Sequence, residues 1–326
     1  MDDERTTTRE LAERVRTLLG PRHPVAAAAL ISASGVTLAA IGADLDADFE
    51  IGSISKAVTG LLYADALERG EIRPDSTLGE LLPLGDVPAA RVRLDSLARH
   101  RSGLPRLPAS AQPLRRTLAL WLRGTNPYGE DLGQLLDQAR GAPVGEPEAL
   151  YSNFGFELLG HALAAAAGTT YADLVQARLA GPLGLRGLYL PDTADRLGPK
   201  ALIGRTRRGR PREPWTGAAI GPAGGIRASI QDMGGLMAAL LDGTAPGIAA
   251  LDPVEAFGKG ARIGAGWITV EAGGRAITWH NGGTGGFRTW AGLDRAAGTG
   301  AVVLSATSDS VDRHGFTLLA EHTSGG

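Results

Sequence analysis

The sequence predicts a mixed α/β fold: an antiparallel sheet flanked by an N-terminal and a C-terminal helix, with an all-helical domain inserted between its strands. Two observations predict it. Runs with strand character occur near both ends of the 326-residue chain, and the long middle section has short helical patterns broken by Gly and Pro. We therefore expect a discontinuous sheet domain of residues 1–70 and 216–326, a helical domain of residues 71–215, and a cleft between them.

The first 70 residues alternate between helical and strand patterns. Residues 1–20 have a helical apolar stripe closed by a glycine. Residues 25–31 and 36–41 are apolar runs on either side of an Ala-Ser-Gly turn, and residues 49–51 form a short third run. From Ser53 to Arg69 the apolar residues return to helical period, so that this helix directly follows a strand.

The rest of the chain gives the remaining elements. The middle section predicts helices at Leu94 to His100, Leu114 to Leu122, Leu132 to Ala139, Phe154 to Ala167 and Tyr171 to Ala180. The last section predicts a helix at Ser229 to Leu241, strands at Arg262 to Val270, Ala276 to Trp279, Phe287 to Leu293 and Gly300 to Ala306, and a closing helix at Asp309 to Glu321.

Composition excludes several classes of function. The chain has 33 Lys plus Arg against 35 Asp plus Glu, a net charge of −2, which lacks the basic excess of a binder of nucleic acid or anionic membrane. It has no cysteine, which excludes thiol catalysis, Cys-based zinc sites and iron–sulfur clusters, and its histidines have no metal-ligand spacing. We expect a small-molecule partner and neither metal nor cofactor; nothing indicates the oligomeric state.

The N-terminal segment bears on localisation. It is acidic and then amphipathic, whereas a signal peptide begins basic and becomes apolar. The apolar run at residues 25–31 is far shorter than the roughly 20 residues of a membrane span. These features predict a cytoplasmic protein.

A serine and a lysine stand at the start of the helix that follows the third strand. In Ser53-Ile54-Ser55-Lys56, residues i and i+3 share one helix face, so the Lys56 amine can reach the Ser53 hydroxyl. A lysine that burial keeps neutral can accept the serine proton, which an arginine cannot. Only three of the 33 basic residues are lysine, so a lysine at this place is less easily explained by chance. The alternative is a surface lysine on an amphipathic helix.

Tyr151-Ser152-Asn153 precedes another predicted helix. A phenol beside a buried lysine could relay a proton, and an amide could orient both lysine and substrate. The alternative is structural, with Ser152 or Asn153 capping the helix and Tyr151 packing nearby.

A glycine-rich segment lies between two predicted strands. Residues 279–287 contain four glycines after His280 and Asn281, which indicates that a ligand or another chain segment approaches the backbone closely. The alternative is a glycine-rich hairpin loop. The spacing does not match a dinucleotide-binding or phosphate-binding loop.

Together and in this order, the three segments resemble the serine β-lactamase and penicillin-binding-protein superfamily, whose signature is S-x-x-K, then Y-x-N, then K-T-G. With tyrosine in the second motif, the chain resembles the class C branch, which includes class C β-lactamases, D-alanyl-D-alanine carboxypeptidases and family VIII esterases. His100 to Pro105 and Gly221 to Asp232 resemble further segments of that branch. The resemblance implies a β-lactamase/transpeptidase-like fold with its active site in the cleft between the two domains.

The resemblance also implies roles for individual residues. Ser53 would be the acylated nucleophile, Lys56 its base partner, Tyr151 the proton relay and Asn153 an orienting amide. The backbone N–H groups of Ser53 and Gly283 would form the oxyanion hole. The residues in the K-T-G position, which would contact substrate, are His280, Asn281 and Gly282.

This chain has His280-Asn281-Gly282 where the family has K-T-G, and the difference bears on the expected substrate. An imidazole that is mostly neutral replaces the lysine charge, which puts carboxylate recognition at this strand in doubt. We expect a serine hydrolase that forms an acyl-enzyme on Ser53 with a small ester or amide. The alternatives are a biosynthetic acyltransferase or cyclising thioesterase, a D-Ala-D-Ala peptidase or β-lactamase, and a non-catalytic scaffold of the same fold.

Overall fold

The structure is a computed structural model that describes residues 2–107, 124–258 and 260–325. Its main sheet is antiparallel, with strands in the order β2-β1-β10-β9-β8-β7-β6-β5. Distant parts of the chain meet within it, because β1 (Ala26–Ser32) pairs with β10 (Thr299–Ser305). The other strands are β2 (Gly35–Ile41), β5 (Glu255–Ala256), β6 (Ala261–Ile263), β7 (Ile268–Ala272), β8 (Arg275–Gly283) and β9 (Arg288–Asp294). The predicted fold class is confirmed.

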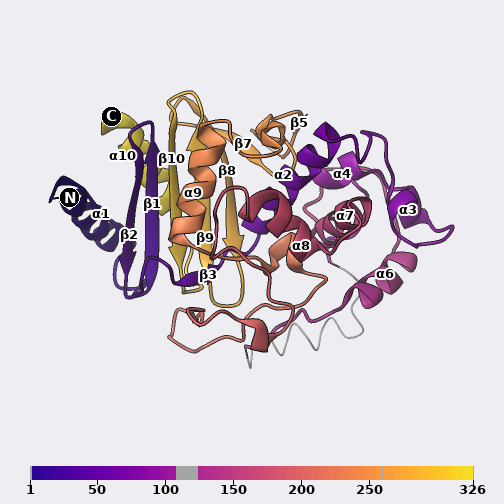
Figure 1. Ribbon diagram of the computed structural model, residues 1–326, viewed down its shortest axis with the longest axis horizontal. Coiled ribbons are helices and arrows are strands. Elements are labelled where there is room, and N and C mark those ends of the chain that lie inside the picture. Colours follow the sequence, from indigo (N-terminus) through magenta and orange to yellow (C-terminus); the bar gives the residue numbers. More distant parts are fainter. Residues whose placement is uncertain (1, 108–123, 259, 326) are drawn as a thin grey trace.

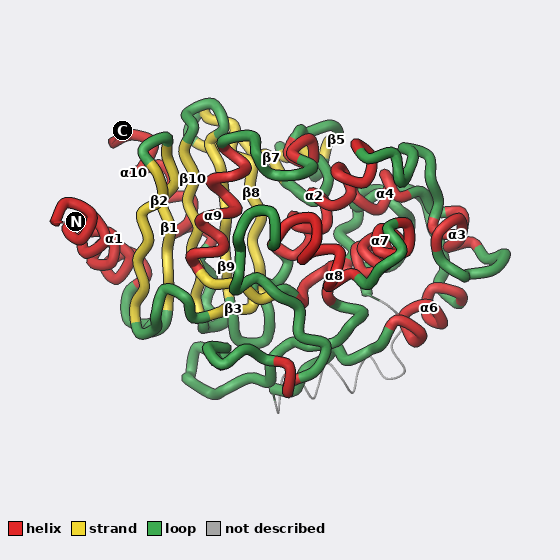
Figure 2. The backbone as a smooth tube through the Cα atoms, in the orientation of Figure 1, coloured by secondary structure: helices red, strands yellow, loops and turns green. Residues whose placement is uncertain are grey.

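Helices cover both faces of the sheet, as Figures 1 and 2 show. On one face lie α1 (Asp2–Leu19) and α10 (Asp312–Gly325), and on the other lies α9 (Ile230–Leu241). Strand β1 contributes to both cores: Ala26 and Ala28 pack in the cluster under α1, whereas Ala27 and Ala29 pack in the cluster that contains α9. Because successive strand residues point to opposite faces, a strand buried on both sides has a continuous apolar run.

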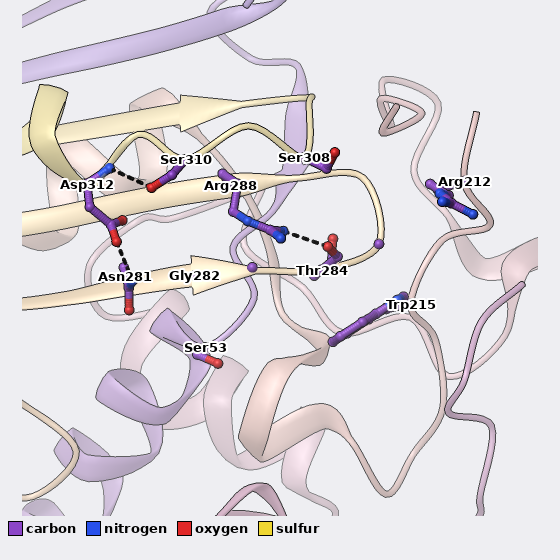
Figure 3. Close-up of a pocket in the computed structure, with 12 residues that line it drawn as sticks. Ser53, Arg212, Trp215, Asn281, Gly282, Thr284, Arg288, Ser308, Ser310 and Asp312 are labelled. Atoms are coloured by element: carbon purple, nitrogen blue, oxygen red, sulfur yellow. Dashed lines mark hydrogen bonds between the residues drawn. The ribbon is translucent and has the colours of Figure 1, made fainter. Parts of the chain in front are cut away.

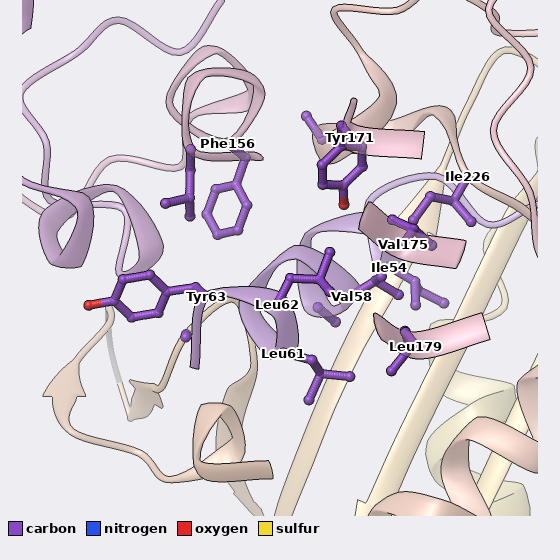
Figure 4. Packing of buried hydrophobic residues seen from close by; sticks show 14 of the residues in the cluster. Ile54, Val58, Leu61, Leu62, Tyr63, Phe156, Tyr171, Val175, Leu179 and Ile226 are labelled. Atoms are coloured by element: carbon purple, nitrogen blue, oxygen red, sulfur yellow. The ribbon is translucent and has the colours of Figure 1, made fainter. Parts of the chain in front are cut away.

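A second group of helices lies beside the sheet, at the right of Figure 1. These are α2 (Ile54–Glu68), α3 (Leu78–Leu81), α4 (Leu94–Ala98), α6 (Leu132–Arg140), α7 (Asn153–Ala166) and α8 (Tyr171–Val175). Helix α2 is the central one, and Figure 4 shows Val58 and Leu62 among apolar side chains that include Phe156 and Val175. Burial on all sides fixes the axis of α2, and therefore the position of Ser53 just before it.

A buried ionic cluster anchors the strand that leads into α2. Strand β3 (Asp48–Glu50) pairs with β4 (Arg227–Ser229) in a separate two-stranded sheet. The fully buried Arg227 forms ion pairs with Asp48 and Glu50, and its Nη2 donates to the carbonyl of Leu202 at 2.9 Å. Removing one partner from such a cluster would leave a buried charge uncompensated, which is strongly destabilising. The cluster therefore fixes β3 in the position from which the chain enters α2.

Several element boundaries differ from the sequence prediction. Arg262 to Val270 is not one strand: it contains β6, a turn and the start of β7, because Gly266 adopts φ +71° and the turn closes through a bond from the Gly264 N–H to the Trp267 carbonyl. Ala276 to Trp279 is only part of β8, which continues to Gly283. The closing helix begins at Asp312, and the predicted helix Leu114 to Leu122 lies outside the described residues.

The remaining differences are smaller. Tyr171 to Ala180 begins as α8 and continues as a π-helical turn over residues 176–180. In the described part of the chain, we find no helix that combines the length and apolar character needed to cross a lipid bilayer.

Candidate active site

Ser53 lies at the junction between the buried strand segment and α2. It is the N-cap residue of α2, yet its side chain makes no capping hydrogen bond. Gly52 before it adopts φ +54°, a backbone conformation that side chains rarely tolerate, so the chain turns sharply here. The hydroxyl of Ser53 therefore points into the pocket shown in Figure 3 instead of closing its own helix.

Lys56 lies one turn into α2, behind Ser53. Its Nζ donates to Ser53 Oγ at 3.2 Å and to the carbonyl of Ala223 at 2.5 Å. The side chain is fully buried, and this burial lowers the pKa of Lys56 to about 7. A substantial fraction of Lys56 is therefore neutral near pH 7 and can accept a proton. Its amine reaches the Ser53 hydroxyl, as the i, i+3 spacing predicts.

Tyr151 lies on the other side of Lys56. The Lys56 ammonium is 4.9 Å from the centroid of the Tyr151 ring, and the Ser53 side chain lies near enough to the tyrosine hydroxyl to lower its pKa in opposition to burial. Burial raises the pKa of Tyr151 to about 12, so the phenol keeps its proton at neutral pH. The structure thus brings Tyr151 of the second motif to Ser53 and Lys56 of the first.

His100 packs against Tyr151 and bonds to the backbone next to it. Its ring lies 4.4 Å from the Tyr151 ring between centroids, and its Nδ1 accepts a hydrogen bond from the Ser152 N–H at 3.1 Å. Burial holds the pKa of His100 well below its ordinary value, so the ring is neutral and Nδ1 is free to accept. The backbone at Ser152 is therefore fixed by the residue that begins the segment His100 to Pro105.

Asn153 is the first residue of α7, and Ser152 is its cap. The Ser152 hydroxyl accepts a hydrogen bond from the Gly155 N–H at 2.9 Å, so the capping alternative holds for Ser152. The Asn153 side chain donates to the Tyr128 hydroxyl at 3.1 Å. Among the described residues it makes no hydrogen bond to Lys56.

A buried carboxyl group near Lys56 carried no recognisable sequence signal. Glu157 lies one turn after Asn153 on α7, is 2 % exposed, and its Oε1 has no hydrogen-bond partner among the described residues. Burial raises the pKa of Glu157 to about 8, against the opposing charge of Lys56. In turn, the negative charge of Glu157 raises the pKa of Lys56, so the two groups titrate as a coupled pair.

Strand β8 forms the facing wall, and its glycines allow a very close approach. A Cβ atom on Gly282 would lie 1.9 Å from the carbonyl oxygen of Ile51, and one on Gly52 would lie 2.5 Å from the backbone nitrogen of Gly283. The Thr289 hydroxyl donates to the same Ile51 carbonyl at 2.8 Å. Gly282 and Gly283 therefore belong to β8 and let it pack directly against the turn that carries Ser53, whereas Gly285 and Gly286 lie in the β8–β9 hairpin turn, where the hairpin-loop alternative holds.

The end of β8 has one unpaired edge. Pairing with β7 stops at Trp279, whereas pairing with β9 continues from Ile277 to Gly283. In the described residues, the edge from His280 to Gly283 thus has no neighbouring strand on the β7 side. An extended segment of a substrate can hydrogen-bond to such an edge.

His280 and Asn281 are placed differently from each other. His280 is 1 % exposed, and its Nδ1 lies 2.6 Å from the carbonyl oxygen of Asn281. Burial and the nearby Lys56 charge lower the pKa of His280 to about 4, so it is neutral at pH 7. Asn281 lines the pocket and donates to Asp312 Oδ2 at 2.9 Å. Neither residue supplies a positive charge.

The pocket around Ser53 has a volume of about 620 Å³, and Figure 3 shows its lining. Of the predicted residues, Ser53, Asn281, Gly282 and Gly283 line it, together with Arg212, Trp215, Thr284, Gly285, Arg288, Ser308, Ser310 and Asp312. These additional residues come from the chain before β4, the β8–β9 turn and the start of α10, so only folding brings them together. No group of three or more His, Asp or Glu side chains that could hold a metal ion is found in the described part of the chain.

An antiparallel sheet beside a buried helix that begins after the pocket serine is the fold of a serine hydrolase of the β-lactamase type. The sequence profile of the β-lactamase family matches residues 11–323, and the chain belongs to that family. The resemblance inferred from the three motifs is therefore confirmed.

Solved structures and curated relatives agree with this assignment. A class C β-lactamase from Rhodobacter sphaeroides superimposes with a TM-score of 0.75 at 21 % identity, over 100 % of this chain and 99 % of that one. The D-alanine carboxypeptidase AmpC from Burkholderia cenocepacia gives 0.76 at 23 %, over 99 % of both chains.

Among curated relatives, the D-alanyl-D-alanine-carboxypeptidase/endopeptidase AmpH of Escherichia coli (strain K12) is 30 % identical over 194 residues, which are 58 % of this chain and 48 % of that protein. Penicillin-binding protein 4 of Amycolatopsis lactamdurans is 26 % identical over 54 % of this chain and 43 % of that protein. The matches thus span about half the length of these relatives.

Proposed function

We propose that this protein hydrolyses a small ester or amide through an acyl-enzyme on Ser53. The observation that carries the proposal is the position of Lys56, fully buried with its Nζ 3.2 Å from Ser53 Oγ. Because burial lowers the pKa of Lys56 to about 7, the amine can take the serine proton at neutral pH. Tyr151, with a pKa of about 12, is a proton donor at that pH and not a base.

The first half-reaction then follows from the geometry. Ser53 Oγ attacks the substrate carbonyl carbon while its proton passes to Lys56 Nζ, and the carbonyl electron pair moves onto oxygen. The backbone N–H groups of Ser53 and Gly283 stabilise this oxyanion; the close packing of Gly52 on Gly283 supports their facing each other. When the tetrahedral intermediate collapses, the leaving group departs with a proton that Tyr151 delivers and recovers from Lys56.

The second half-reaction reverses these roles with water as the nucleophile. Lys56 removes a proton from water, the new oxygen bonds to the acyl carbon, and the bond to Ser53 Oγ breaks as Lys56 returns a proton to it. Asn153 donates to the hydroxyl of Tyr128, whose ring packs against the pocket residue Trp215, and so orients this part of the pocket wall. A biosynthetic acyltransferase or cyclising thioesterase would share the first half-reaction and differ only in using an amine as acceptor.

The strand side favours esters over β-lactams. In place of the lysine of K-T-G, β8 has His280, which is buried and neutral. A D-Ala-D-Ala peptidase is the second candidate, favoured by the 30 % identity to a protein named as a D-alanyl-D-alanine carboxypeptidase and endopeptidase.

Competing substrates test the proposal. The protein is incubated with a p-nitrophenyl ester, with penicillin and with a D-Ala-D-Ala peptide, with and without an added amine, and turnover and intact mass are followed beside Ser53→Ala. We expect the ester to be turned over, with acyl transfer to water, and no turnover by Ser53→Ala. Turnover of the peptide or of penicillin in preference to the ester would contradict the substrate class. Absence of any covalent adduct in a folded protein would favour the scaffold alternative.

A further inference from the structure

A second cavity lies in the helical region, apart from the pocket around Ser53. Its volume is about 470 Å³, within the range of roughly 300–1,000 Å³ that small-molecule sites occupy. Its walls come from α3, α6, α7 and α8, which lie together at the right of Figure 1, and from the chain that leads to β4. Of the described residues, none lines both this cavity and the active-site pocket.

The lining of the second cavity is apolar and offers no positive charge. Buried leucines such as Leu82 and Leu136 form much of it, and none of its described lining residues is Lys or Arg. Its imidazole, His161, is neutral because burial lowers its pKa, and Nε2 donates to the Ala218 carbonyl at 3.1 Å. Its carboxylate, Asp192, is exposed and would repel an anion. These features favour an uncharged ligand with a hydrocarbon body.

One chain segment separates the two cavities. Trp215 lines the active-site pocket, whereas Gly217, two residues later, lines the second cavity. The segment continues into the buried turn Gly221–Gly225, whose first residue also lines the second cavity. Within this turn, the Ala223 carbonyl accepts the hydrogen bond from Lys56 Nζ at 2.5 Å. The turn therefore has the second cavity on one side and the proposed base on the other.

Tyr171 connects the cavity wall to α2 through hydrogen bonds. Its hydroxyl lies 2.6 Å from Thr59 Oγ1, and Figure 4 shows the hydroxyl pointing toward α2. Thr59 Oγ1 also lies 2.7 Å from the Pro222 carbonyl oxygen and 3.0 Å from that of Ser55. Because carbonyl oxygens only accept, the threonine proton goes to one of them and Tyr171 donates to Thr59. The cavity wall is thus bonded to the helix that carries Lys56.

Close packing joins the same groups. A Cβ atom on Gly160 of α7 would lie 2.3 Å from Pro222 and 2.9 Å from Tyr171 Cε2. A Cβ atom on Gly221 would lie 3.5 Å from Tyr171 Cδ1. A ligand that packs against Tyr171 and Gly221 therefore contacts the turn that positions the Ala223 carbonyl. Dense interiors transmit such contacts because they have little free volume.

We propose that this cavity is a second binding site, for an uncharged and largely apolar small molecule, and that its occupancy accelerates acylation of Ser53. A ligand that fills the cavity adds dispersion contacts to the turn of residues 221–225 and stabilises the arrangement in which Ala223 holds Lys56. The binding site does not depend on the chemistry at Ser53, whereas the effect on acylation rests on the proposed function.

A matched pair of probes tests the binding site. 1-Octanol and octanoate have the same alkyl chain length and differ in charge. In Ser53→Ala, 1-octanol should raise the unfolding temperature, and octanoate should bind on the order of 10-fold or more weakly, because its carboxylate would enter an apolar cavity without a counter-charge. Equal shifts with the two probes, or no shift with 1-octanol, would overturn the proposal.

A pair of alanine substitutions tests where the probe binds. Ala165 is an exposed lining residue of α7, so Ala165→Trp should fill the cavity and abolish the shift with 1-octanol. Ala177 is exposed on residues 176–180 and lies outside the lining, so Ala177→Trp should keep the shift. A shift that persists in a folded Ala165→Trp protein would place the probe elsewhere and overturn the proposal.

The rate of fluorophosphonate adduct formation tests the effect on acylation, since 1-octanol cannot act as an acyl acceptor in that reaction. Saturating 1-octanol should raise the rate in wild type by about 5-fold, at the lower end of allosteric couplings. Tyr171→Phe keeps the ring in the cavity wall but removes the donor to Thr59, so it should bind 1-octanol and lose most of the acceleration. An unchanged or lowered rate in wild type at saturation would overturn the coupling.

The two sets of measurements separate this proposal from the proposed chemistry. Cavity-dependent binding of 1-octanol to Ser53→Ala, together with no adduct in wild type, would support the second site and contradict the acyl-enzyme. Adduct formation on Ser53 without any binding of 1-octanol would leave the chemistry standing and overturn the second site.

Discussion

The pocket has a helix side, formed by α2 and Tyr151, and a strand side, formed by β8 and β9, and the two sides differ in their ionisable groups. On the helix side, Lys56 and Tyr151 are withdrawn from water, and their pKa values move to about 7 and about 12. On the strand side, glycines expose backbone, His280 is neutral, and Arg288 keeps its charge at the pocket wall. We therefore expect burial around α2 to set the reactivity of Ser53, and the residues of the β8–β9 hairpin to set recognition of the substrate.

The largest effect is expected from removing the base on the helix side. Lys56→Met keeps the length of the buried side chain but has no proton acceptor, so acylation of Ser53 should fall by on the order of 10²–10⁴-fold. The rate of adduct formation, followed by intact mass, measures it.

Lys200→Met is the matched control, because Lys200 is exposed and pairs with Asp46 away from the pocket. It should acylate at the wild-type rate. A Lys56→Met protein that also did so would show that another group is the base.

A pair of glycine substitutions tests the close approach on the strand side. Gly282→Ala would place a Cβ atom 1.9 Å from the Ile51 carbonyl, so β8 and the Ser53 turn must separate. We expect a loss in the free energy of unfolding of about 1–3 kcal/mol or more, together with loss of activity. Gly283→Ala would meet only the Arg288 side chain, at 3.1 Å, and should be better tolerated. Equal unfolding temperatures for the two variants would contradict the close packing of Gly282 against the Ile51 carbonyl.

The pH profile tests whether burial sets reactivity. Because the active form has a neutral Lys56, kcat/KM should rise with pH through an apparent pKa near 7 and then level off, since Tyr151 keeps its proton far above that pH. Glu157 and Lys56 titrate as a coupled pair, and the fraction of Glu157 that is ionised on the rising limb raises the pKa of Lys56, so Glu157→Gln should move the limb to slightly lower pH.

Glu148→Gln, at an exposed position, is the control for the general effect of losing a carboxylate. It should leave the limb in place. A limb that stayed fixed in Glu157→Gln, or moved to higher pH, would mean that Glu157 does not act on the lysine.

The smallest effect is expected at the hydrogen bond between the strand side and α10. Asn281→Ala removes the donor to Asp312 and should lower the free energy of unfolding by about 0.5–1.5 kcal/mol. A double-mutant cycle with Asp312→Ala isolates the pairwise contribution. Fully additive effects would show that the contact contributes nothing to stability.

Prediction from sequence succeeded where local spacing fixes geometry. Ser53 and Lys56 share a helix face whatever surrounds them, and the strands near the chain ends have apolar runs that a sheet buried on both faces requires. The β8 extension to Gly283 was missed because its glycines have low strand propensity and are retained for their closeness to Ile51.

The rest of the site depends on tertiary packing. Glu157 looks like an ordinary polar residue of an amphipathic helix until the fold buries it beside Lys56. Arg288 and Trp215 become pocket residues only when distant segments close around Ser53. No local period or spacing marks such residues, because their surroundings are made by elements far away in the sequence.

Covalent trapping tests the central claim most directly. The protein is treated with a fluorophosphonate, digested, and the modified peptide is sequenced by mass spectrometry beside Ser53→Ala and Lys56→Met. The account predicts one adduct, on Ser53, absent from Ser53→Ala and formed far more slowly by Lys56→Met. An adduct on another residue, or one that persists in Ser53→Ala, would contradict it.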